Sequence, residues 1–250
     1  MNSAVVIDAL SLPAETRVNQ RVPKKLFTEN GAPTAADKRH IQEGIEELVW
    51  VASLKPNNIG VPAFRDETHD YLEIAVLVGT LRAEAKASRL TELIHRAIPY
   101  PGVLVITSGA SQTLSLAHKR LSQGETGKIV LEDALAMADL NTGAVVEANF
   151  LKTLSLATQP QKNLFALYQG WLDRITALAA SRLTGVFALA GTPEESSNYR
   201  NILDEHAQLE RELALLRTQA AKELQFSRRV EFNLAIQRLE QQIGQLTSHL

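Results

Sequence analysis

Apolar residues recur three and four positions apart through the last quarter of the chain, and polar residues fill the positions between them. No glycine or proline lies between Glu194 and Ile243, and Pro193 stands where a helix accepts proline, in its first turn. This pattern predicts a long amphipathic helix, or a helical hairpin, over residues 191–250. A helix with a long apolar stripe buries that stripe against another helix, so the pattern indicates assembly.

The apolar stripe of this region changes phase near its middle. One stripe runs to Ala220, a second begins at Phe232, and the two do not share a register across residues 225–233. The segment is therefore either a coiled-coil helix with a stutter or a helix that turns back on itself. The residues that we expect to form the interaction surface of this tail are Leu209, Leu213, Leu216, Ile236, Leu239 and Ile243.

Earlier segments alternate between strand and helix patterns. Runs rich in β-branched residues predict strands over residues 48–54, 71–81, 102–109, 112–122 and 128–137, and 3.6-residue periods predict helices over residues 34–48, 87–98 and 163–185. Thr34 is the expected N-cap of the first of these helices. Residues 17–27 are expected to follow an extended path, because Pro23 disfavours a helix there.

The order of these elements predicts an α+β fold with a mixed or antiparallel sheet and helices on one face. An α+β domain is expected over residues 1–150, a helical segment over 151–190 and the coiled-coil or hairpin tail over 191–250.

Composition narrows the class of protein. Apolar residues make up 45% of the 250, which is enough for a sizeable core and argues against wholesale disorder. The net charge of −2 is spread evenly, so no basic half indicates nucleic acid. The absence of cysteine excludes disulfides, a catalytic thiol and thiolate zinc sites. With no signal peptide pattern and no run of ~18 apolar residues, the chain is expected to be cytoplasmic and to have no membrane partner.

Established catalytic motifs are missing from the sequence. It contains no GxxxxGK[ST] phosphate loop, no GxSxG and no HExxH. A metal-dependent nuclease would need a carboxylate followed two residues later by lysine, and neither Glu73 nor the Glu132–Asp133 pair has that lysine. We therefore assign no catalytic residue, no metal and no cofactor, and we favour a protein that is not an enzyme.

Some charged residues are nevertheless candidates for contact with a phosphate or another ligand. They are Lys24, Lys25, Lys55, Glu73, His118, Lys119 and Arg120. Each has a plainer interpretation: Lys24 and Lys25 as a solvated arm, and the cations from His118 to Arg120 as protection of a strand end. Glu73 lies in an apolar strand and needs a partner, which Lys55 or Lys119 could supply as a structural ion pair or as the centre of a site.

Several segments together resemble a known family. They are RVPKKLF, VWVASLKPNNIGV, YLEIAVL, IHRAIPYPGVLVI, LAHKR and the C-terminal KELQFSRRVEFNLAIQRLEQQI. With them the chain resembles the bacterial domain of unknown function 4391, over nearly its whole length. Members of that family are often encoded beside type III-like DNA methyltransferases and helicases, so the resemblance implies a role in restriction-modification or anti-phage defence. Where relatives tend to have an aromatic residue before Lys-Arg, this chain has His118.

Two functions follow as hypotheses. The first is a non-catalytic accessory or assembly subunit of a bacterial defence complex, which pairs through its C-terminal helix with a helicase subunit, a DNA methyltransferase subunit or itself. The alternative is a nucleic-acid binding or processing protein, with the charged candidates gathered around one pocket of the α+β domain. Their clustering in one cleft would favour the alternative, and their scatter would count against it.

Overall fold

The strand predicted over residues 71–81 lies in the middle of a six-stranded sheet as β5 (Ile74–Leu81). The computed structural model describes residues 4–122, 124, 129–132, 134–140 and 145–250. The sheet has the order β1-β2-β5-β6-β7-β10, and its other strands are β1 (Arg17–Arg21), β2 (Ile45–Leu54), β6 (Gly102–Ser108), β7 (Ser111–Leu116) and β10 (Ala136–Leu140). Neighbouring strands are antiparallel except β5 and β6, which are parallel. Of the mixed or antiparallel sheet that the sequence predicts, the structure has the mixed form.

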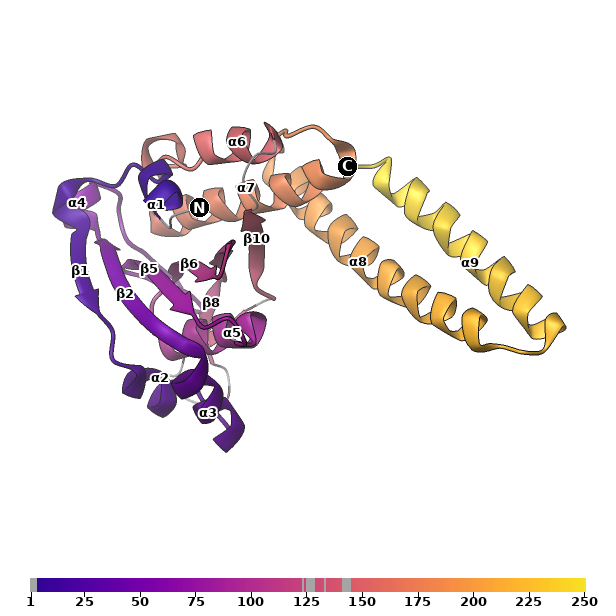
Figure 1. Cartoon of the computed structure of the whole chain (residues 1–250). Coiled ribbons are helices and arrows are strands. Elements are labelled where there is room, and N and C mark those ends of the chain that lie inside the picture. Colours follow the sequence, from indigo (N-terminus) through magenta and orange to yellow (C-terminus); the bar gives the residue numbers. More distant parts are fainter. Residues whose placement is uncertain (1–3, 123, 125–128, 133, 141–144) are drawn as a thin grey trace. The chain divides into compact units, whose positions relative to one another are not determined.

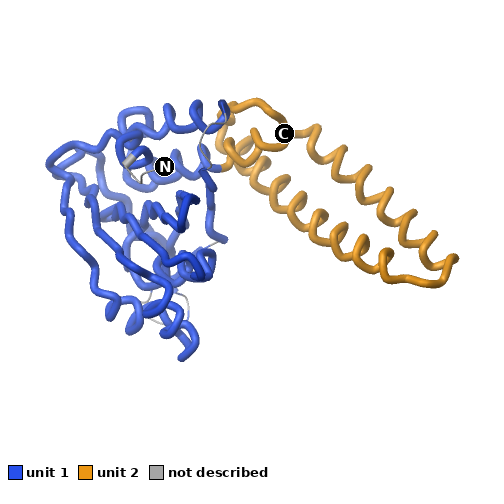
Figure 2. The backbone as a smooth tube through the Cα atoms, viewed as in Figure 1, with its two compact units in different colours: residues 1–175 blue, residues 176–250 orange. Residues whose placement is uncertain are grey.

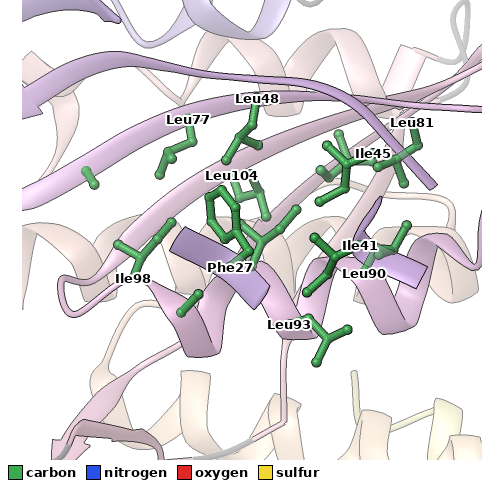
Figure 3. Close-up of a cluster of buried hydrophobic side chains, with 14 residues drawn as sticks. Phe27, Ile41, Ile45, Leu48, Leu77, Leu81, Leu90, Leu93, Ile98 and Leu104 are labelled. Carbon is green, nitrogen blue, oxygen red and sulfur yellow. The ribbon is translucent and has the colours of Figure 1, made fainter. Parts of the chain in front are cut away.

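Helix α5 (Ala87–Ala97) connects the two parallel strands and covers one face of the sheet with α2 (Lys24–Asn30) and α3 (Ala35–Gly44). Figure 3 shows the resulting core, in which Phe27 of α2 lies beside Leu104 of the sheet and Leu93 of α5 belongs to the same cluster. The close contact between α2 and α5 requires a glycine after α2. A Cβ on Gly31 would lie 2.6 Å from the backbone oxygen of Leu93. The core of this face therefore depends on two helices that are far apart in the sequence.

Helices lie on both faces of the sheet, whereas the sequence predicted them on one. Figure 1 shows α1 (Ala4–Ala9), α6 (Val145–Lys152) and the first part of α7 (Leu164–Thr184) on the side away from α2, α3 and α5. The physical reason is visible in β6: Leu104 and Ile106 face α5, while Val103 and Val105 on the opposite face are equally buried. A strand that is apolar on both faces needs a cover on each side.

Side-chain hydrogen bonds hold α7 against the sheet and the preceding segment. The Tyr168 hydroxyl accepts from the backbone nitrogen of Ala117 at 2.9 Å and donates to the Gly102 carbonyl at 2.8 Å. The Trp171 indole donates to the Leu154 carbonyl at 2.9 Å. Both side chains are fully buried, and a buried hydroxyl or indole N–H needs a hydrogen-bond partner. Tyr168 and Trp171 each have one.

Some predicted elements need correction. Residues 24–30 form the helix α2, not an extended path, because Pro23 occupies the N-cap position, where its missing N–H costs nothing. Helix α3 is capped by Thr34 as predicted, with the Asp37 N–H donating to Thr34 Oγ1 at 3.1 Å, but it ends at Gly44, and β2 begins at the next residue.

The strands predicted over residues 112–122 and 128–137 are each divided. The first becomes β7 and β8 (Lys119–Leu121), and the second becomes β9 (Ile129–Leu131) and β10. Strands β8 and β9 pair with each other in a separate two-stranded ribbon, whereas β7 and β10 belong to the main sheet. One half of each predicted strand therefore lies outside the main sheet. Lys128 and Asp133 lie outside the described residues. The remaining short elements are η1 (Ala14–Thr16), α4 (Pro56–Ile59), η2 (Leu156–Thr158) and the ribbon of β3 (Phe64–Arg65) and β4 (Asp70–Tyr71).

The chain divides into two compact units, residues 1–175 and residues 176–250, and the division falls inside α7 (Figure 2). The second unit contains α8 (Pro193–Lys222) and α9 (Phe226–Thr247), which contact each other along a helical hairpin (Figure 1). Thr192 caps α8, because its hydroxyl accepts from the Glu195 N–H at 3.1 Å. Of the two predicted forms of the tail, the structure therefore has the hairpin. No helix among the described residues has the length and apolar character needed to cross a bilayer.

Candidate functional site

Lys24 and Lys25 lie on α2, at the surface of the α/β unit. The Lys24 ammonium donates to the Gln42 carbonyl at 3.1 Å, and Lys25 pairs with Glu29, one helical turn away, at 3.6 Å. Partial burial lowers the pKa of Lys24, and the neighbouring Arg82 and Arg21 lower it further. Both lysines thus have partners within the chain, as expected for a charged helix surface.

Glu73 and Lys55 form an ion pair at the other end of β2. Glu73, which is 8% exposed, accepts from the Ser53 hydroxyl at 2.6 Å through one carboxylate oxygen. Its other oxygen lies 3.1 Å from the Lys55 ammonium. Asn58 supports the turn, since its side chain accepts from the Lys55 N–H at 2.8 Å and donates to the Ser53 carbonyl at 2.9 Å. Of the two partners predicted for Glu73, Lys55 is the one that contacts it, and each carboxylate oxygen has a partner.

Lys119 is buried and takes part in the end of α5 instead. Its ammonium donates to the backbone carbonyls of His95, at 2.6 Å, and Ile98. A cation at this position stabilises the negative end of the helix dipole. Burial lowers the pKa of Lys119 to about 7. The neighbouring His95 contacts Ser115 Oγ at 3.1 Å, and burial, with the nearby Lys119, lowers the pKa of His95 to about 3.

His118, which directly precedes β8, lies in a cluster of aromatic side chains. The Tyr71 hydroxyl is 2.5 Å from His118 Nδ1, and Gln169 Oε1 is 2.7 Å from His118 Nε2. The ring of Phe165 stacks on His118 with centroids 4.9 Å apart. Arg120, the third predicted cation of this segment, donates weakly to the Leu121 carbonyl at 3.4 Å. His118 therefore takes part in packing and hydrogen bonding like an aromatic residue.

His69 belongs to the same aromatic cluster. It was not among the candidates predicted from the sequence. Its two ring nitrogens lie 3.2 Å from Asp66 and 3.1 Å from Glu132. Burial lowers the pKa of His69, but the hydrogen bonds to Glu132 and Asp66 outweigh burial, so the pKa lies above its usual value. Asp66 accepts backbone N–H bonds from Thr68 and His69, which hold its own pKa well below the usual range. The sequence shows Asp66 and His69 close together in the turn of residues 66–69, but it gives no sign of the contact with Glu132, which is 63 residues further along the chain.

The charged candidates do not meet in one pocket. Lys24 contacts Gln42, just before β2 begins, whereas Lys55 follows the end of β2. At about 3.3 Å per residue, a ten-residue strand separates these two positions by roughly 30 Å. Lys119 is held at the end of α5 by the His95 carbonyl. Among the described residues, no group of three or more histidines, aspartates or glutamates is arranged to hold a metal ion.

The six residues predicted as an interaction surface lie along the seam of the hairpin. Leu209 and Leu213 of α8 are buried, and Leu216, Ile236, Leu239 and Ile243 are partly buried. Because α8 and α9 contact each other along this hairpin, these stripes close on each other within the chain. A surface for a partner has to come from other residues.

Four large apolar side chains remain exposed around the turn of the hairpin. We call Leu224, Phe226, Val230 and Leu234 the distal apolar surface; their exposed fractions are 97%, 73%, 40% and 50%. The last three stand four residues apart on α9, so they share one face of the helix. Lys222, Arg228 and Arg229 are exposed around them, and the Arg229 guanidinium lies 5.9 Å from the Phe226 ring centre.

A family model describes nearly the whole chain. It carries the description "Domain of unknown function (DUF4391)" and matches residues 10–243. The chain belongs to this family. No curated protein and no solved structure matches it.

Proposed function

We propose that the protein is a non-catalytic accessory subunit of a bacterial restriction-modification or anti-phage defence complex, and that it binds its partner through the distal apolar surface. The defence role is what membership of the family suggests, given the genes beside its members. The assembly role is supported by one observation: the hairpin closes its own seam and still exposes four large apolar side chains at its end.

The exposure of these side chains is the reason to assign them a partner. A soluble protein gains about 25 cal/mol for each Å² of apolar surface that it removes from water, and contiguous exposed apolar patches are typical of binding surfaces. A hairpin that served only to stabilise the fold would have no use for Phe226 and Leu224 outside its seam. We also propose that the side chains of α8 and α9 interdigitate regularly, as they do between the helices of a coiled coil.

The charges around the surface favour a partner of defined chemistry. The exposed cations Lys222, Arg228 and Arg229 outnumber the anions Glu223 and Glu231 between residues 222 and 231. We therefore expect an apolar groove with an acidic rim, carried by the helicase or methyltransferase subunit of the same defence system. Rim charges of this kind mainly set the rate and specificity of binding, while the apolar contacts supply affinity.

The experiment is a tagged pull-down from the native host in nuclease-treated lysate, with recovered proteins identified by mass spectrometry. The wild type should recover a helicase or methyltransferase subunit in near-equal amount, and the Leu224→Asp/Phe226→Asp variant should lose at least tenfold of it. The matched control is Val145→Asp, which changes an exposed residue of α6 and should leave recovery unchanged. Equal recovery with the distal variant, or recovery of this chain alone, would refute the proposal.

The alternative function, binding of nucleic acid in one charged pocket, has little support in this geometry. Its residues are separated along β2, and Lys119 is committed to the end of α5. Any phosphate contact by Lys24 or Lys25 would then be a surface contact, with binding that weakens steeply as salt rises.

A further inference from the structure

A cavity of about 680 Å³ lies between the ends of α2 and α5 and the ribbon strand β9. Its walls combine apolar side chains, such as Ile98, Pro99 and Val130, with polar and charged residues. The polar and charged residues are Glu29, Asn30, His95, Arg96 and Lys119. A concave site with apolar walls and a few polar groups has the character of a small-molecule site.

The ammonium of Lys119 has no counter-ion among the described residues. Within the described residues its ammonium donates to the carbonyls of His95 and Ile98, and the residue is 4% exposed. Glu29 also lines the cavity, but its carboxylate pairs with Lys25. A buried cation without an anion is costly, and burial accordingly lowers the pKa of Lys119 to about 7.

Other cations around the cavity are neutral or already paired. His95 is fully buried, and burial lowers its pKa to about 3, so its imidazole is neutral at physiological pH. Arg96 is bound to Glu92 at 2.7 Å. Lys119 is thus the cation of this lining that has no carboxylate partner among the described residues, and an anion with an apolar body would complement both Lys119 and the apolar part of the wall.

We propose that this cavity binds a small organic carboxylate, with its anionic group on the Lys119 ammonium and its apolar body against Ile98, Pro99 and Val130. The carboxylate would supply the missing counter-ion, and its body would fill apolar space that water occupies at a cost. The Lys119 amine has to be protonated for this contact, so binding takes up a proton wherever the empty cavity holds the neutral amine. The proposal is independent of the role assigned to the hairpin.

Benzoate is the probe, and benzamide is its neutral analogue of the same shape. Calorimetric titration of the full chain at pH 6.5 should give a saturable benzoate site at least tenfold tighter than benzamide. The affinity should fall about tenfold for each pH unit above 7, as the protonated fraction of Lys119 falls. Absence of saturation up to roughly 20 mM, or equal binding of the two probes, would overturn the proposal.

Lys119→Met, which keeps the volume of the side chain, should weaken benzoate at least tenfold, while Lys25→Met on the nearby surface should not change its binding. If the Lys119 variant fails to fold because α5 loses its C-terminal partner, the wild type alone decides the question. Titrations at pH 8 in phosphate and in Tris, which differ in heat of ionisation, should show uptake of close to one proton per benzoate. Zero uptake together with unchanged benzoate binding in Lys119→Met would exclude Lys119 as the anion's partner.

Discussion

Arg217 of α8 donates a hydrogen bond to Glu240 of α9 at 2.7 Å, which joins the two helices of the hairpin across 23 residues of sequence. Both side chains are about half exposed, so the pair contributes little stability by itself, on the order of 0.5 kcal/mol. The pair defines the register of the hairpin, because it shows which turn of α9 lies beside which turn of α8. That register places the apolar stripes of the two helices against each other.

Substitution of the seam should therefore open the hairpin itself. In Leu213→Asp/Leu216→Asp, two charges replace side chains in the seam, one of them only 3% exposed, and an unpaired charge is not tolerated there. We expect a loss of helical circular dichroism and faster proteolysis within residues 193–247. The matched control is Leu215→Asp, which changes a side chain that is 65% exposed and should leave both unchanged. Equal protease resistance of the seam variant and the wild type would contradict the closed seam.

Replacement of Glu73 should lower the free energy of unfolding more than replacement of its partner Lys55. Glu73→Ala leaves the Ser53 hydroxyl without its acceptor, and we expect a loss of about 2 kcal/mol in the free energy of unfolding. Lys55→Met removes only a half-exposed ammonium and should cost about 0.5–1 kcal/mol. Urea denaturation at pH 7 measures both. A larger cost for Lys55→Met would mean that Glu73 depends on the ion pair more than on the hydroxyl.

Acid should weaken the contact between α3 and α5. Arg89 bonds both oxygens of Asp37 at 2.9 Å, and these bonds, with one from Thr34, lower the pKa of that carboxyl to about 2. Since the folded pKa is depressed, the stabilisation is complete above the ordinary value near 3.8 and disappears as the pH falls towards 2. The stability difference between wild type and Asp37→Asn should shrink over that window in urea titrations. The exposed control Asp204→Asn should show no such change.

The ribbon contact through His69 should respond to pH in the opposite direction. Hydrogen bonds to Glu132 and Asp66 raise the pKa of His69 above its ordinary value near 6.5. A raised pKa gives stabilisation that is complete below 6.5 and is lost as the pH rises through the folded value. His69→Gln should therefore destabilise the protein more at pH 6 than at pH 9, as followed by thermal unfolding. His249→Gln at the exposed C-terminus is the control, and a pH-independent effect of His69→Gln would exclude the charged form.

Local sequence features predicted most of the individual elements. The strand of β5, the helix α5, the Thr34 cap and the start of α8 at Pro193 follow from period and capping alone, because each depends on residues within one or two turns. The helix α2 was missed because Pro23 was taken to keep residues 17–27 extended, whereas a proline restricts the residue before it, and Pro23 itself is the N-cap of α2. The division of residues 128–137 was missed because its two halves pair with different partners: β9 pairs with β8 in a ribbon, and β10 pairs with β7 in the main sheet.

The candidate residues were predicted less well than the elements. Glu73 in an apolar strand indicated a partner, and its identity as Lys55 needed the pairing of β2 with β5. No spacing in the sequence connects His69 with Glu132, which are 63 residues apart. The exposure of Phe226 and Leu224 was equally invisible, since an apolar residue beside a stripe looks the same whether it is covered or not.

The sequence by itself determined most of the helices and strands, that the sheet is mixed or antiparallel, and that the last quarter is helical with apolar stripes that pack helix against helix. Those features depend on short-range periodicity, on capping side chains and on the few residues that restrict the backbone. Only the tertiary structure decided that the helical tail closes on itself, that helices cover both faces of the sheet, and that Lys119 is buried at the end of α5. The physical reason is that an apolar stripe or a charge gains the same energy from a partner anywhere in the chain or in another molecule, so its own position cannot reveal which one it meets.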